Sequence, residues 1–273
     1  MKTLVQYTKR PYIYAVMITI GIMALYSILH TSSAISYFAA SISLYTLLLF
    51  ELYSTKFYAT TFDDQFELTS KSKKHRKAHW VHHLIMPTVL FVSIVLFVFA
   101  NSQLNMALVI ALISLVLFSI LFLNIKAYYE NKYKLENKTA NVYDVISIAS
   151  VFMLAFSIFV VTALLGELYI ISGLMNTAVL IILGYLTLAR YHIINKQGGM
   201  MLFAMLLVYF NSFLALLNFD ISIVAHTILT TFVYYYFTAV VNHYEEKSLD
   251  LKVIIEYLAV FVIIFVIIIL GHI

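Results

Sequence analysis

The chain contains no cysteine, only two prolines and only seven glycines among its 273 residues. The absence of cysteine excludes disulfides, thiolate metal sites and cysteine nucleophiles. Scarce glycine and proline argue against the broken mid-membrane helices with which many secondary transporters bind substrate. Both prolines, Pro11 and Pro87, fall in the first turn of a predicted helix, where proline is tolerated. Phosphate-binding glycine loops and the H-E-x-x-H and G-x-S-x-G motifs are also missing, which removes the familiar signatures of soluble enzymes.

Charge is scarce as well: 11% of the residues are charged, whereas 63% are hydrophobic. Soluble globular proteins average roughly 45–50% apolar and about 25% charged residues. The apolar residues occur in uninterrupted runs of about 20, the length needed to cross about 30 Å of hydrocarbon. These runs lack the alternating polarity of β-barrel strands. The sequence therefore predicts an all-α integral membrane protein.

The hydropathy pattern predicts nine transmembrane helices in a single polytopic membrane domain that covers residues 1–273. The predicted spans are 11–29, 34–53, 84–100, 105–125, 143–165, 168–189, 200–217, 221–241 and 253–270. Four very short turns, at 30–33, 101–104, 166–167 and 218–220, separate pairs of spans. Because short turns make paired helices antiparallel neighbours, we expect a bundle of four hairpins followed by a single final helix.

All seventeen Lys and Arg residues lie on one side of this pattern. By the positive-inside rule, the N-terminus is predicted to lie inside and the C-terminus outside. The net charge of +4 is spread along that membrane face, which favours anionic lipid headgroups as partners and gives no sign of nucleic-acid binding. The expected location is the cytoplasmic (inner) membrane of a microbe.

The longest connection, 54–83, is a basic juxtamembrane segment on the predicted inner side. Its first half, Lys56–Phe62, is β-branched and aromatic, so it is predicted to form either a small hairpin or an irregular interfacial segment. Its second half, Ser70–His83, is predicted to be helical and to continue into the third membrane helix. Each cation near the surface contributes about 1 kcal/mol of attraction to anionic lipid.

The sharpest local feature of the chain is a group of four closely spaced histidines: His75, His79, His82 and His83. On a helix they occupy an arc of about 100°, and neutral imidazole is a common ligand of zinc and iron. The spacing resembles the histidine boxes of membrane fatty-acid desaturases and hydroxylases. Those enzymes use several boxes to hold two irons, whereas the other inner-side histidines here, His192 and His243, are single. No family is assigned on this basis. The alternatives are an aromatic, basic membrane anchor or a pH-responsive surface.

Six ionisable residues are predicted at the inner ends of the spans: Glu51, Asp144, Arg190, His192, His243 and Glu256. Ionisable groups in a membrane segment are functional suspects because exposing them to lipid is costly. If they converge, they could bind a divalent metal and a lipid headgroup. The alternative is structural, with salt bridges between helices and snorkelling at the interface.

Four polar residues are predicted deeper in the outer half of the bilayer: Asn176, Asn211, Ser212 and His226. Hydrogen bonding between helices is the usual role of such residues. The sharper alternative is a path for a proton or a small solute.

Three functions follow from these features. We favour a non-enzymatic scaffold, assembly subunit or sensor of a membrane complex, partnered by another membrane protein or by further copies of the chain. The rival is a metal-dependent membrane enzyme that acts on a lipid at the inner interface through His75–His83. A small-solute or proton transporter that uses Asn176, Asn211 and His226 comes third. We predict no cofactor, with zinc or iron belonging to the enzyme hypothesis alone.

Overall fold

The computed structural model describes the backbone of residues 2–63, 70–101, 103–130, 136–166, 169–217 and 221–270. It describes the side chains of residues 10–54, 83–101, 103–127, 141–166, 169–217 and 221–270. Within these ranges the chain forms nine helices and no strand. The helices are α1 (Lys2–Thr31), α2 (Ala34–Asp63), α3 (Ser70–Ala100), α4 (Leu104–Glu130), α5 (Glu136–Leu164), α6 (Tyr169–Arg190), α7 (Lys196–Leu216), α8 (Ile223–Glu245) and α9 (Leu251–Leu270).

Each of these nine helices contains a stretch that is long and apolar enough to cross a membrane. Counting described side chains only, the stretch in α3, His83–Ala100, already has 18 residues, close to the roughly 20 needed to span the hydrocarbon core. A helix satisfies its backbone hydrogen bonds internally, which is the requirement that lipid imposes. The chain is therefore a multi-pass, all-helical integral membrane protein, as the composition predicted.

One local prediction is wrong. The helix α2 continues to Asp63, so Lys56–Phe62 forms neither a hairpin nor an irregular segment. Extending an existing helix gains a hydrogen bond for each residue fixed, and this outweighs the weak preference of Thr, Tyr and Phe for strands. By contrast, α3 begins at Ser70 and includes the basic half of the connection, as predicted.

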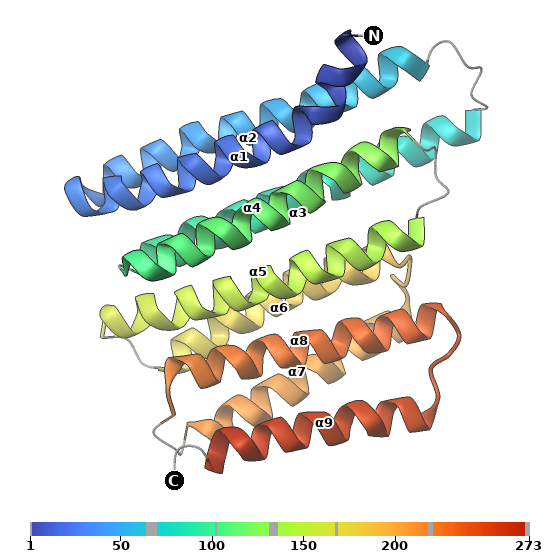
Figure 1. Cartoon of the computed structure of the whole chain (residues 1–273). Coiled ribbons are helices and arrows are strands. Elements are labelled where there is room, and N and C mark those ends of the chain that lie inside the picture. Colours follow the sequence, from blue (N-terminus) through green and yellow to red (C-terminus); the bar gives the residue numbers. More distant parts are fainter. Residues whose placement is uncertain are drawn as a thin grey trace. The chain divides into compact units, whose positions relative to one another are not determined.

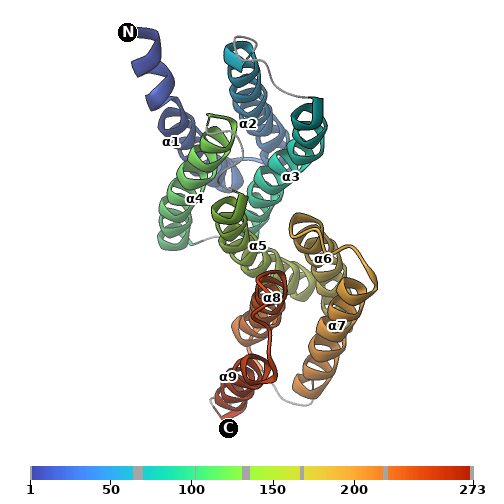
Figure 2. The ribbon, with the colours of Figure 1, turned by 90° about the vertical axis from the view of Figure 1, so that its right-hand side faces the viewer.

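The chain divides into two compact units, residues 1–146 and 147–273, and the division falls inside α5. The sequence predicted one membrane domain over the whole chain, and both units are built from membrane-spanning helices. In unit 1, each of α1–α4 contacts the other three (Figures 1 and 2). The most extensive of these contacts is between α1 and α4, which are separated in sequence by two other helices.

The core of unit 1 is apolar and includes Ile18, Leu48, Ile94 and Phe118. Several of its buried polar groups find partners inside the bundle. The hydroxyl of Tyr37 in α2 donates to the carbonyl of Val95 in α3 at 2.6 Å. A buried polar group left without a partner in hydrocarbon costs several kcal/mol, on the order expected for a lost hydrogen bond and its desolvation.

In unit 2, α6, α7 and α8 contact one another, and α9 packs against α8 at the edge of the unit (Figure 2). Phe213, near the end of α7, lies against Gly173 near the start of α6 and against His226 near the start of α8. The opposite ends meet where Leu202 of α7 lies against Gly184 of α6. The directions of α6 and α8 are therefore opposite to that of α7.

The reversal between α6 and α7 is built from local hydrogen bonds. The side chain of Asn195 caps α7 by accepting from the backbone N–H of Gly198 at 2.9 Å. A Cβ atom at position 198 would lie 2.0 Å from the carbonyl oxygen of Ile193, so the close approach of the two backbones requires glycine there.

At two helix ends a residue other than glycine adopts the left-handed conformation. His192 after α6 has φ 56° and Lys247 after α8 has φ 57°. In each case the backbone N–H of the next residue donates to a carbonyl in the last turn of the helix. Ile193 donates to Leu188 at 2.9 Å, and Ser248 donates to His243 at 2.9 Å. This is the Schellman arrangement, in which glycine is the favoured residue at the left-handed position.

Candidate functional site

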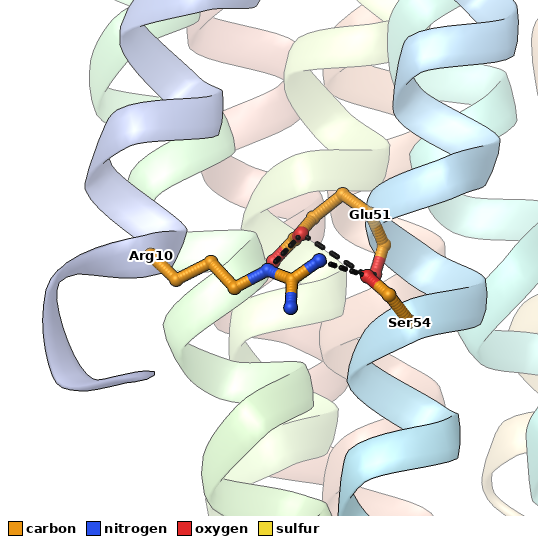
Figure 3. Close-up of polar contacts among 3 residues, drawn as sticks. All are labelled: Arg10, Glu51 and Ser54. Carbon is orange, nitrogen blue, oxygen red and sulfur yellow. Dashed lines mark hydrogen bonds and ion pairs between the residues drawn. The ribbon is translucent and has the colours of Figure 1, made fainter. Parts of the chain in front are cut away.

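The best-formed ionic site among the described side chains lies between α1 and α2 in unit 1. The Nε atom of Arg10 donates to Oε2 of Glu51 at 2.9 Å, and Nη2 donates to the hydroxyl of Ser54 (Figure 3). The Ser54 hydroxyl also lies 3.1 Å from the carbonyl oxygen of Glu51. Glu51 and Ser54 are three residues apart, so both project from the same face of α2 toward Arg10.

The burial of this pair is unequal. The side chain of Glu51 is 2% exposed, whereas that of Arg10 is 20% exposed. The guanidinium also lies over the ring of Tyr14, 5.4 Å from its centroid, which adds a cation–π contact. A buried carboxylate whose oxygens already accept hydrogen bonds is held in place and charge-balanced. For Glu51 the structure therefore contains the salt bridge between helices that was the structural alternative.

Sequence reasoning singled out Glu51 but missed its partnership with Arg10. The signal is present in the two-residue link between α1 and α2, because residues equally distant from a tight turn lie at similar depth. Arg10 precedes the end of α1 by nearly the distance at which Ser54 follows the start of α2. Matching depths across that link would have placed Arg10 beside the turn of helix that holds Glu51 and Ser54.

A second polar contact joins α3 to the first turns of the α5 span. Nδ1 of His83 is hydrogen-bonded to the hydroxyl of Tyr143, and both side chains are buried. Lys126, close to the end of the α4 span, is buried as well, whereas Asp144 is half-buried. The Tyr143 contact fixes the His83 ring within unit 1.

The predicted metal site can be located only in part. His75, His79 and His82 lie outside the residues whose side chains are described. Among the side chains that are described, no group of three or more His, Cys, Asp or Glu residues could hold a metal ion. Metal binding by the full set of four histidines stays a prediction.

The six residues of the predicted inner ring are divided between the two units. Glu51 and Asp144 belong to unit 1, and the other four belong to unit 2. In unit 2, Arg190 donates to the hydroxyl of Ser147 at 3.2 Å, linking α6 to α5. His192 is exposed at the reversal after α6.

The remaining two members of that predicted ring lie near the link between α8 and α9. Nδ1 of His243 is 2.9 Å from the Ser248 hydroxyl, and Nε2 is 3.5 Å from the Tyr257 hydroxyl. Glu256 is 63% exposed, and Nζ of Lys252 on the same helix lies 3.9 Å from its Oε1. Glu256 therefore differs from Glu51 in two ways: its side chain is exposed, and the cation in contact with it comes from its own helix.

The four predicted intramembrane residues differ in their burial. Asn176 and His226 are buried inside unit 2. Asn211 is exposed and its Nδ2 donates to the carbonyl of Leu207 in its own helix at 2.8 Å, while Ser212 is half-buried. Asn176 and His226 therefore lie in the interior of unit 2, whereas Asn211 lies on the surface of α7.

Around His226 the interior of unit 2 is aromatic. The centroid of its ring lies 5.3 Å from that of Phe159, 5.6 Å from that of Phe213 and 5.9 Å from that of Tyr169. The hydroxyls of Thr162 and Ser172 are hydrogen-bonded to each other beside this aromatic group. A histidine enclosed by rings and hydroxyls can exchange a proton or bind a small polar molecule.

Comparisons with protein-family models, with curated proteins and with solved structures find no match. The chemistry available to the chain is inferred from its own geometry. In the described residues that geometry comprises a closed ion pair in unit 1, a polar group among aromatic rings in unit 2, and an exposed carboxylate on α9.

Proposed function

We propose that this protein is a non-enzymatic scaffold or assembly subunit of a membrane complex, and that α9 is the helix that binds the partner. A contrast between two carboxylates supports this proposal. Glu51 is 2% exposed and is paired with Arg10 from a neighbouring helix. Glu256 lies about 7.5 Å into its span by helical rise, yet it is 63% exposed.

An ionised side chain that faces lipid within a span is costly, by about 2.5–3.5 kcal/mol at the helix centre and less toward the interface. A partner helix that offers a cation or a hydroxyl to Glu256 removes that cost. The rest of α9 suits the same purpose, because of its twenty residues only Phe261 and Ile268 are buried. The occupant we assign to this surface is a transmembrane helix of another protein, with a hydrogen-bond donor one to two turns from the basic boundary.

Photo-crosslinking in intact membranes tests this assignment. A photoreactive residue at Ile263 or Ile267 of α9 is expected to give a discrete protein adduct, and Glu256→Leu is expected to reduce its yield. Matched controls are Ile42 of α2 and Leu112 of α4, which are equally apolar and comparably exposed. If the α9 positions capture only lipid, as the controls are expected to do, the proposal is wrong. An adduct with a second copy of the chain would replace the partner protein by a homo-oligomer.

The orientation that we propose has the N-terminus inside, the C-terminus outside and four hairpins that open toward the inner side. All seventeen Lys and Arg residues then face the anionic inner leaflet. Because the chain has no cysteine, a single introduced thiol reports its own side without background. An impermeant maleimide added to intact cells is expected to label Ser32→Cys but not Glu246→Cys, and the reverse labelling would invert the topology.

A further inference from the structure

We propose that unit 2 contains a buried water-binding site between Asn176 of α6 and Tyr209 of α7, reached from the end of the unit that holds His226. Two buried polar atoms support this proposal. Nδ2 of Asn176 donates to the carbonyl of Ser172 at 3.0 Å, whereas its Oδ1 has no hydrogen-bond partner among the described residues. The Tyr209 hydroxyl likewise makes no hydrogen bond of standard geometry, and the polar side chain nearest to it in interaction is that of Thr230. Both residues are 0% exposed.

Three polar side chains of unit 2 lie at the same depth on three mutually contacting helices. Asn176 lies seven residues after the start of α6, Tyr209 seven residues before the end of α7, and Thr230 seven residues after the start of α8. At the rise of a helix this is about 10 Å from the helix ends. Those ends adjoin, because Phe213 contacts both Gly173 and His226. Since all three side chains are buried, they face the interior that the helices share.

The hydrogen-bonding groups of these three side chains suit a bound water molecule. The Oδ1 atom of Asn176 accepts, the Tyr209 hydroxyl donates, and the Thr230 hydroxyl, which itself donates to the carbonyl of His226 at 2.9 Å, still has lone pairs free to accept. Buried waters usually make about three such bonds to polar groups that lack other partners. The side chains of Asn176, Tyr209 and Thr230 carry no charge, so a neutral ligand suits the site better than a cation.

Polar groups also mark a route to this site. Thr162 and Ser172 bond to each other about one turn nearer the helix ends than Asn176. His226 lies at a similar level, and the ring of Tyr169 that packs on it is exposed. Hydroxyls and an imidazole therefore lead from the surface of unit 2 toward Asn176. The proposed water site is independent of the proposed role of α9.

A double-mutant cycle on the full-length protein tests the shared ligand. If one water bridges the two groups, Asn176→Leu and Tyr209→Phe each lower Tm, by about 2–4 °C for a loss of the usual size. The double variant then loses little more than one single variant, because the same water is lost once. If the site is dry, Asn176→Leu raises Tm, because an unsatisfied polar group is replaced by an apolar one of similar size, and the proposal is overturned.

Asn211→Leu is the matched control for this cycle. Its side chain makes the same hydrogen bond to its own helix, at 2.8 Å, but lies on the exposed surface of α7. Asn211→Leu should change Tm little, and its effect on Tm should be additive with that of Tyr209→Phe.

Thiol reactivity tests the route. In the cysteine-free chain, Asn176→Cys is expected to react with a small methanethiosulfonate at least about tenfold faster than Leu180→Cys, because reaction requires a hydrated thiolate. Leu180 lies one turn further along α6 and is equally buried. Equal rates at the two positions would contradict selective access of water to Asn176, and the proposed route would be wrong.

Discussion

The guanidinium of Arg10 and the carboxylate of Glu51 are 2.9 Å apart, and they join α1 to α2 through residues 41 positions apart in sequence. Because Glu51 is the more buried partner, the two single deletions should differ. Arg10→Leu removes the cation that pairs with the buried carboxylate of Glu51 and should destabilise by about 3–5 kcal/mol. Glu51→Leu should cost less, since the long Arg10 side chain can reach water. Thermal unfolding in detergent measures both changes.

Two further variants calibrate this comparison. The double variant Arg10→Leu/Glu51→Leu should recover most of the stability that Arg10→Leu loses, because no buried charge remains. Lys252→Leu should change stability by less than about 1 kcal/mol, because Lys252 lies one residue after the start of α9, where its 82% exposed side chain can extend to the interface, and its contact with Glu256 is long at 3.9 Å. An equal loss in the two single deletions of the Arg10–Glu51 pair would contradict the assigned asymmetry.

The two adjacent glycines at the start of α7 should respond in opposite ways to alanine. Gly198→Ala places a Cβ atom 2.0 Å from the carbonyl oxygen of Ile193, which is backbone and cannot move without disturbing the reversal. Gly199 has no atom within 4 Å of its Cβ position, so Gly199→Ala should stabilise by roughly 0.5–1 kcal/mol through lower backbone entropy in the unfolded chain. Unfolding of both variants under identical conditions checks the difference.

Glycine should be favourable where the structure has a left-handed residue with a side chain. His192→Gly and Lys247→Gly should each raise stability by about 1 kcal/mol, because the left-handed conformation costs other residues roughly that amount. Differential scanning calorimetry of the two variants provides the measurement. Ser32→Gly, at an exposed position outside the Schellman ends, serves as the comparison and should show no such gain.

Metal analysis distinguishes the scaffold hypothesis from the hypothesis of a metal-dependent enzyme. Protein purified without chelators should contain zinc and iron far below stoichiometric amounts, because the basic neighbours of His75–His83 oppose a bound cation. Nδ1 of His83 is in addition hydrogen-bonded to Tyr143. Stoichiometric metal that is lost in His79→Ala and retained in His192→Ala would instead favour a metal-dependent enzyme.

The sequence predicted the class of fold because lipid imposes it directly. A run of about 20 apolar residues can cross hydrocarbon only as a helix or a closed barrel, and the runs in this chain do not alternate. The partners of each helix were not predictable in the same way. The main packing partner of α1 in unit 1 is α4, two helices away, and an apolar helix gives little indication of which face its neighbours will cover.

The candidate sites were predictable by residue type but not by environment. Asn176 and Asn211 are both amides inside predicted spans, yet Asn176 is buried whereas Asn211 is exposed. Glu51 and Glu256 are both carboxylates close to the ends of predicted spans, and they differ in the same way. Which of two similar residues is covered depends on the packing of other helices around it, and that packing involves contacts distant in sequence.

The packing of α1 on α4 has a consequence for biogenesis. The ribosome makes about 100 residues between the end of α1 at Thr31 and the end of α4 at Glu130, which at roughly 5–20 residues per second takes on the order of 5–20 s. During that interval α1 lacks its main partner, but α2 is already available. The Arg10–Glu51 pair joins only these two helices, so it can form before α3 and α4 have been synthesised.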